Sequence, residues 1–266
     1  MKIDLDKILQ PVCNIAIEAG LLINTFYEKN INITIKEDNS PLTDADLGAN
    51  KLIIDSLKKL NKEIPILTEE SLVDWSLRKK LKCYWLVDPL DGTKEFIKKN
   101  GEFTVNIALI ENNYPVMGVI YAPAFSELYY ASKNKGTYKL ICEKELSSLS
   151  KSKKLFLKPK NINDKIKIFG SRSHKSDKFD NWIQGKFSNY ELIRKGSSIK
   201  FCKIAEGEVD IYPRFGPTSE WDIAAGHIIL TEAGGKIKSI DQQKIIYNKK
   251  ESVTNPPFLA YGDLLI

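Results

Sequence analysis

Three acidic clusters carry the strongest chemical signal in this 266-residue sequence. Each follows an apolar stretch or opens an apolar helical pattern, and the three are Thr68-Glu69-Glu70-Ser71, Asp88-Pro89-Leu90-Asp91-Gly92-Thr93 and Trp221-Asp222. Acids at the ends of strands converge on a shared crevice in α/β folds. Such carboxylates repel one another unless cations lie between them, and Mg²⁺ prefers oxygen ligands. The pattern predicts a two-metal site that clamps the attacking and leaving oxygens of an in-line phosphoryl transfer.

The turn Asp91-Gly92-Thr93 adds a second feature of phosphate chemistry. A glycine permits close backbone approach, and N–H groups at a helix start can cradle a phosphate. A simpler interpretation stays open, in which each acid is a separate cap or turn. That interpretation suits Glu69 and Glu70 taken alone, and an acid such as Asp222 is typical of a helix N-terminus. It suits Asp88 and Asp91 less well, because both follow a buried apolar run.

The elements that must position these acids can be predicted from periodicity. Helical spacing of apolar residues predicts a helix over 5–27 and another after Thr43, where Thr43 or Asp44 serves as the cap. The apolar stripe of the second helix consists of Leu47, Leu52, Ile53 and Leu57. Strands are predicted over 31–36, 64–67, 84–87 and 128–131, with a hairpin of 103–110 and 116–121 across residues 111–114.

The segment 145–165 is rich in Lys, Ser and Asn, which predicts a loop that joins two halves. We therefore expect one unit over 1–266 made of two closely packed halves, an α+β half of about 1–145 and an α/β half of about 165–266. The second half is predicted to contain strands over 166–170 and 209–212, and helices over 197–205 and 219–233. This order predicts layered α/β sheets rather than a barrel.

Composition narrows the class of protein only slightly. The net charge of +6 suits an anionic substrate, RNA or a membrane surface, and the lysine runs near 151–154 and 249–250 are typical of solvated loops. The four cysteines form no CxxC or Cys/His cluster, so neither a zinc site nor a disulfide framework is predicted and a reducing cytoplasm is the simplest location. The N-terminus lacks an uninterrupted apolar core, and no stretch reaches about 18 apolar residues, so neither a signal peptide nor a transmembrane helix is predicted.

Three motifs together resemble the signature set of the inositol monophosphatase superfamily. They are TEES at 68–71, DPLDGT at 88–93 and WDIAAG at 221–226. The resemblance extends from Ser40-Pro41 to Glu232-Ala233-Gly234-Gly235. It implies a layered αβαβα sandwich and a Mg²⁺-dependent phosphatase. It also implies that Glu70 lies outside the ligand set of the metals, which consists of Glu69, Asp88, the Leu90 carbonyl, Asp91 and Asp222.

In this resemblance Glu69 and the Leu90 carbonyl bind the first metal ion, and Asp88 is shared between both ions. Asp91 and Asp222 hold the second. Thr93 with Asp46 resembles the pair that orients and deprotonates the attacking water, together with Glu69. The chemistry is reasonable, because a carboxylate-backed threonine hydroxyl can accept a proton from water.

The subfamily follows from further motifs. The runs DGTKEFIKKNGEFTVNIALI, GSRSH at 170–174, GSSIKFC at 196–202 and YPRFGPTSEWDIAAGH at 212–227 resemble bacterial 3′(2′),5′-bisphosphate nucleotidases. Arg214 stands where the inositol enzymes tend to place a glutamate, and its planar fork suits a phosphate. His174, Ser197 and Lys200 match positions that hold the nucleotide. For each residue taken singly a simpler interpretation stays open. These are a surface location for His174, a solvated side chain for Lys200 and an ion pair with an acid for Arg214.

The resemblance implies hydrolysis of adenosine 3′,5′-bisphosphate to AMP and phosphate, sensitivity to lithium and a role in sulfate assimilation. Peripheral membrane association and the oligomeric state stay open. Substrate contacts are expected from Glu69, Leu90, Asp91, Gly92, Thr93, His174, Ser197, Lys200, Arg214 and Asp222. One alternative is an inositol or sugar-phosphate monophosphatase. Another is a basic RNA-binding protein without catalysis, but the sequence has no RNA-recognition aromatic signature or basic stripe.

Overall fold

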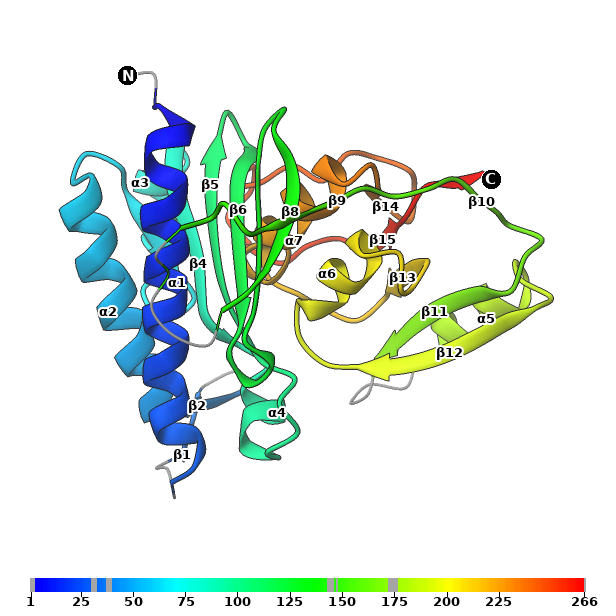
Figure 1. Ribbon diagram of the computed structural model, residues 1–266, viewed down its shortest axis with the longest axis horizontal. Helices are drawn as coiled ribbons and strands as arrows, with labels where there is room; N and C mark the ends of the chain where they lie inside the picture. Colours follow the sequence, from blue (N-terminus) through cyan, green and yellow to red (C-terminus); the bar gives the residue numbers. More distant parts are fainter. Residues whose placement is uncertain are drawn as a thin grey trace.

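The computed structural model describes residues 3–29, 33–36, 40–142, 146, 148–171 and 177–265. They form five layers (Figure 1). Helices α1 (Leu5–Tyr27) and α2 (Asp44–Leu60) cover a seven-stranded sheet, and α6 (Ile199–Ala205) and α7 (Glu220–Glu232) lie between it and a five-stranded sheet. Helix α5 (Asp177–Gln184) packs on the far face of the second sheet. The predicted αβαβα sandwich is confirmed.

The seven-stranded sheet has the order β3-β4-β5-β6-β7-β8-β9. Its strands are β3 (Ile66–Thr68), β4 (Cys83–Asp91), β5 (Thr104–Glu111), β6 (Tyr114–Ala122), β7 (Glu127–Ser132), β8 (Gly136–Ile141) and β9 (Lys153–Leu155). Strands β3 and β4 are parallel, and the other neighbours are antiparallel. The predicted hairpin is confirmed as β5–β6. The loop prediction for 145–165 is wrong in part, because β9 closes this sheet from within that segment.

The five-stranded sheet has the order β12-β11-β13-β15-β14. Its strands are β11 (Ile166–Ser171), β12 (Tyr190–Lys195), β13 (Ile211–Arg214), β14 (Lys236–Ser239) and β15 (Phe258–Tyr261). Two small pairs complete the strands, β1 (Ile33–Ile35) with β2 (Pro41–Thr43) and β10 (Lys160–Asn161) with β16 (Leu264–Leu265). The short helices are α3 (Trp75–Arg78), α4 (Thr93–Ile97) and a 3₁₀ turn at Pro123–Phe125. Strand β13 ends at Arg214, two residues later than predicted, so this side chain belongs to a strand end.

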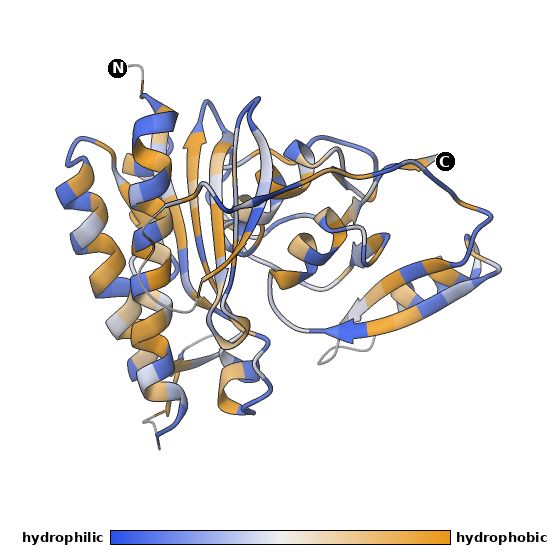
Figure 2. Cartoon of the chain, in the orientation of Figure 1, coloured by the Kyte–Doolittle hydropathy of each residue, from blue (hydrophilic) through white to orange (hydrophobic). Residues whose placement is uncertain are grey.

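Helix α1 is long and apolar enough, by length and composition, to cross a membrane. In the structure it lies on the seven-stranded sheet and beside α2, and Val12, Ala16, Ala19 and Ile23 are fully buried there. Core helices of globular proteins have the same composition. Figure 2 shows that β5 and β6 beneath it are largely apolar, whereas the turns are polar.

Helix α7 is buried on almost every side because it lies in the middle layer. Its approach to β6 depends on Gly118, since a Cβ there would lie 2.4 Å from Ile228 Cγ2 and 2.6 Å from the Ala225 carbonyl oxygen. This close packing fixes the start of α7, and therefore Asp222, relative to the first sheet.

Candidate active site

Two capping boxes position acidic side chains of the site. At the start of α2, Asp46 Oδ2 accepts hydrogen bonds from Thr43 N (2.8 Å) and Thr43 Oγ1 (2.5 Å). At the start of α7, Asp222 Oδ2 accepts one from Ser219 N (2.9 Å). In each box one carboxylate oxygen closes the helix end, so the other is available to the site. In Asp46 that second oxygen accepts a hydrogen bond from Thr93 Oγ1 at 3.1 Å.

The next acids come from the end of β4. Asp88 lies opposite Asn106 and Asp91 opposite Thr104, with an irregular register between them. Strand β4 continues through Asp91, so the prediction that it ends at residue 87 is wrong. Leu90 N donates to Asp88 Oδ1 at 3.1 Å, and the Leu90 carbonyl accepts from Thr93 Oγ1 at 3.2 Å. A bulge of this kind re-aims side chains at the end of a strand.

Glu69, Asp88 and Asp222 each offer a carboxylate oxygen, and the three oxygens lie within 4.8 Å of one another. Burial, followed by the charges of Glu69 and Asp91, raises the pKa of Asp88 well above its ordinary value. Burial also raises the pKa of Asp222 and of Glu69. A cluster of mutually repelling carboxylates around the buried Asp88 fits a cation, and its oxygen-only donors fit a hard one.

Lys36 is a site residue that the sequence did not reveal. Its Nζ lies 2.8 Å from Glu69 Oε1 and 2.6 Å from Glu70 Oε1. Burial lowers the pKa of Lys36, but the charges of these two carboxylates and the hydrogen bonds to them outweigh it, so the pKa is raised. The partners are 33 and 34 residues away in the sequence, and no local pattern indicates such a contact. The ammonium group supplies positive charge to the acidic cluster.

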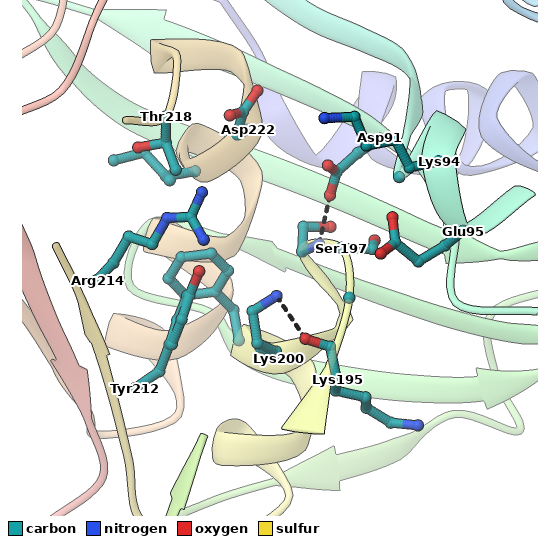
Figure 3. A pocket seen from close by; sticks show the side chains of 15 residues that line it. Asp91, Lys94, Glu95, Lys195, Ser197, Lys200, Tyr212, Arg214, Thr218 and Asp222 are labelled. Carbon is teal, nitrogen blue, oxygen red and sulfur yellow. Dashed lines mark hydrogen bonds between the residues drawn. The ribbon is translucent and has the colours of Figure 1, made fainter. Parts of the chain in front are cut away.

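The acidic cluster opens into a cavity of about 540 Å³ that also reaches Leu90, Gly92 and Thr93. A second cavity of about 140 Å³ adjoins it through Asp91 and Asp222. Figure 3 shows that Lys200, Tyr212 and Arg214 line this second cavity from the C-terminal half, opposite Asp91. The site therefore has an acidic end and a basic end.

The basic end contains two cationic groups, the buried Lys200 and the half-buried Arg214. Lys200 is 5% exposed, its Nζ donates to the Lys195 carbonyl at 3.2 Å, and it lies 4.9 Å above the ring of Tyr212. Burial lowers the pKa of Lys200 to about 8, with Asp91 opposing and Arg214 reinforcing the shift. Arg214 Nη2 donates to the Pro217 carbonyl at 2.9 Å, whereas its buried Nε has no hydrogen-bond partner among the described residues. A buried unsatisfied guanidinium N–H is a donor available to an anionic ligand.

Gly92 joins the two ends. It has φ +92°, and a Cβ there would lie 2.7 Å from the Glu102 carbonyl and 3.2 Å from Ser197 Cβ. The turn at Asp91-Gly92-Thr93 therefore packs against the loop that carries Ser197, and a side chain at position 92 would separate them.

Most predicted site residues are brought together by the structure. Around the two cavities and the Thr93–Asp46 contact lie Asp46, Glu69, Asp88, Leu90, Asp91, Gly92, Thr93, Ser197, Lys200, Arg214 and Asp222. His174 lies outside the described residues. Lys94 and Glu95, which belong to a predicted subfamily motif but not to the expected site residues, line both cavities.

This chain belongs to the inositol monophosphatase family, whose model matches residues 4–262. It is 42% identical to the 3′(2′),5′-bisphosphate nucleotidase CysQ of Salmonella typhimurium over 252 residues, which cover 94% of this chain and 98% of that protein. The CysQ protein of Escherichia coli K12 is 40% identical over the same length.

Solved structures agree with this assignment. CysQ from Bacteroides thetaiotaomicron, described as a bacterial member of the inositol monophosphatase family, superposes with a TM-score of 0.85 at 40% identity and 97% coverage of both chains. The Thermotoga maritima inositol monophosphatase superposes with a TM-score of 0.75 at 21% identity, which shows the shared fold. Phosphatases of this family depend on metal ions, and the Glu69, Asp88 and Asp222 cluster fits that requirement.

Proposed function

We propose that this chain is a 3′(2′),5′-bisphosphate nucleotidase that converts adenosine 3′,5′-bisphosphate to AMP and phosphate. One observation carries the proposal: the carboxylate cluster adjoins a cavity lined by Lys200 and Arg214. A substrate with two phosphates suits a site with an acidic, metal-binding end and a basic end. The relatives named CysQ support the same substrate class.

The basic end anchors the phosphate that does not react. Lys200 supplies an ammonium group and Arg214 supplies an unsatisfied N–H, and both are positioned by backbone carbonyls. Binding energy from this phosphate orients the reacting one at the acidic end. Gly92 and Thr93 place backbone N–H groups beside it, at the start of α4. Ser197 lines the cavity between the two ends.

Thr93 and Asp46 handle the proton of the attacking water. Because the Thr93 hydroxyl donates to Asp46 Oδ1 at 3.1 Å, its lone pairs can accept a water proton. As Thr93 accepts the water proton, its own hydroxyl proton passes to Asp46, and burial, which raises the pKa of that carboxylate, favours this transfer. Glu69 lies at the same end and would orient the water.

Glu69, Asp88, the Leu90 carbonyl, Asp91 and Asp222 would hold Mg²⁺, which supplies Lewis-acid stabilisation of the charge on the reacting phosphoryl oxygens. The donor set is oxygen throughout, as Mg²⁺ prefers. The cytoplasm is the proposed location, since the cysteines are all thiols.

Phosphate release from a panel of phosphomonoesters tests the proposal. The panel contains adenosine 3′,5′-bisphosphate, adenosine 3′-monophosphate, inositol 1-phosphate and fructose 1,6-bisphosphate, each with and without Mg²⁺. The highest kcat/KM is expected for the adenosine bisphosphate, with activity only when Mg²⁺ is present. A preference for inositol phosphate would assign the protein to the rival subfamily, and binding of RNA without any hydrolysis would assign it to another class.

A further inference from the structure

Three alternating residues, two in β5 and one just before it, hold three consecutive residues of the loop before α6. We call Glu102, Thr104 and Asn106 the β5 ladder, and residues 196–198 the α6 loop. The contacts, in order, are Gly196 N to Glu102 Oε2 (2.8 Å), Ser197 Oγ with Thr104 Oγ1 (2.7 Å), and Ser198 Oγ to Asn106 Oδ1 (2.8 Å). Alternate residues of an extended segment point to the same face, so one face at the start of β5 matches the loop residue by residue.

The α6 loop needs such support because its backbone is strained. Ser197 has φ +56°, a left-handed conformation that residues other than glycine seldom adopt. Residues in such conformations persist where the surrounding structure determines them, and they cluster at functional sites. The β5 ladder provides that surrounding structure.

The α6 loop also joins the two ends of the candidate active site. The Ser198 backbone N–H donates to Asp91 Oδ2, which restrains one oxygen of this expected metal ligand. Two residues later, Lys200 reaches the basic end. A displacement of the loop would therefore move Asp91 and Lys200 together.

Thr104 is at the centre of this arrangement and is fully buried. Its hydroxyl lies 2.7 Å from Ser197 Oγ, 2.8 Å from Ser198 Oγ and 3.5 Å from Asp91 Oδ2. Because Ser198 donates its proton to Asn106, Thr104 donates to Ser198 and accepts from Ser197. From its fully buried position the Thr104 hydroxyl links Ser197, Ser198 and the Asp91 carboxylate, which fits positioning rather than contact with a substrate.

We propose that Thr104 is a positioning residue that couples the metal-binding end of the pocket to the phosphate-binding end through the α6 loop. The proposal rests on the proposed function, since it assumes that Asp91 binds a metal ion and Lys200 a phosphate. Its consequence is that removal of one hydroxyl weakens the binding of both ligands.

The test compares Thr104→Val with a matched control, Thr137→Val. Thr137 is also fully buried in the seven-stranded sheet, but its hydroxyl donates to the Ile229 carbonyl on α7. Both substitutions keep a β-branched shape and remove a single hydroxyl. Thr104→Ser restores the hydroxyl and serves as the rescue variant.

Affinities for Mg²⁺ alone and for AMP alone are measured by calorimetry, and kcat and KM for adenosine 3′,5′-bisphosphate by phosphate release. Thr104→Val is expected to weaken both affinities several-fold and to lower kcat/KM at least about 10-fold. Thr137→Val should leave all of these values unchanged, and Thr104→Ser should recover most of them. Ser198→Ala breaks the same chain at its next link, and it should reproduce the pattern if Thr104→Val does not fold.

Wild-type affinities in Thr104→Val, or equal losses in both valine variants, would overturn the positioning role. A loss confined to one ligand would overturn the coupling. If the wild type fails to hydrolyse the bisphosphate, the proposed function is wrong, whereas the Mg²⁺ and AMP titrations still decide whether Thr104 acts on both ends.

Discussion

Arg214→Met tests whether the basic end of the pocket holds a second phosphate. Arg214 ends β13, donates from Nη2 to the Pro217 carbonyl at 2.9 Å, and keeps a buried Nε that finds no partner in the part of the chain that the structure describes. Methionine retains most of the apolar stem and removes the charge and all the donors. The variant therefore deletes the expected phosphate contact without placing a new charge in the pocket.

The size of the effect follows from the contact that is lost. A hydrogen bond to a charged group contributes about 1.5–3 kcal/mol, and about 1.4 kcal/mol corresponds to a factor of ten. We expect kcat/KM for adenosine 3′,5′-bisphosphate to fall about 10- to 150-fold. Stability should respond differently. Loss of the Pro217 contact costs about 1 kcal/mol, but removal of a buried unsatisfied donor returns about 1–3 kcal/mol, so the Tm should stay level or rise.

The assay uses two substrates that share the reacting group. Adenosine 3′,5′-bisphosphate carries both phosphates, and adenosine 3′-monophosphate lacks the second one. The variant should lose activity on the first and change little on the second, with thermal melts as the check on folding. Equal losses on both substrates, or a fall in Tm that parallels the loss of activity, would refute the assignment of Arg214 to the second phosphate.

Three further predictions concern the charged groups of the site. Asp88→Asn should abolish phosphate release and raise the Tm of the metal-free protein, because it removes the buried carboxylate of a self-repelling cluster; near-normal turnover would contradict the shared-ligand role. Added Mg²⁺ should stabilise the wild type by about 2.7 kcal/mol at 100 times its Kd, and a Tm insensitive to Mg²⁺ in calorimetry would count against a metal site. The pKa of Lys200 is lowered to about 8, so its charged form prevails below that pH and is lost above it. Affinity for AMP in metal-free protein should therefore fall as the pH rises through about 8, and Lys200→Arg should remove that dependence; equal pH profiles would exclude Lys200 as its source.

The candidate site was largely predictable because its main motifs are contiguous in sequence. Asp88, Leu90, Asp91, Gly92 and Thr93 come from one strand end and one turn, so their proximity follows from local geometry. The prediction that Asp222 lies near these residues depended on the resemblance to a known family, since no local sequence pattern indicates that α7 starts beside β4. Its position depends on packing such as that of Gly118 against α7.

Contacts between distant segments could not be read from the sequence. Lys36 reaches Glu69 across 33 residues, and Thr104 reaches Ser197 across 93. Periodicity describes which face of an element is buried, and it carries no information about the element that covers that face. Hydroxyl groups add a further difficulty, because threonine and serine are equally common at turns, on surfaces and in buried networks.

The errors in the secondary structure have similar causes. The apolar stripe predicted for α2 is wrong at Leu47, which is 49% exposed, whereas Ala45 and Ala49 are fully buried. Small residues mark the buried face of α2, because α1 and α2 pack closely together. The apolar pattern does not predict strand β12, because this strand lies at an edge of its sheet and carries Glu191, Arg194 and Lys195. Charged edge strands have weak apolar patterns.

The sequence left two interpretations of the acids open, helix caps or site ligands, and the structure shows that these interpretations do not compete. Asp46 and Asp222 both occupy the third position of a capping box. A capping box engages one carboxylate oxygen and fixes the rotamer, so the second oxygen has a defined direction before any ligand binds. In Asp46 that oxygen meets Thr93, and in Asp222 an oxygen lies within the carboxylate cluster. The cap thus provides the preorganisation that a metal or proton acceptor needs, since such sites depend on side chains already held in the productive geometry.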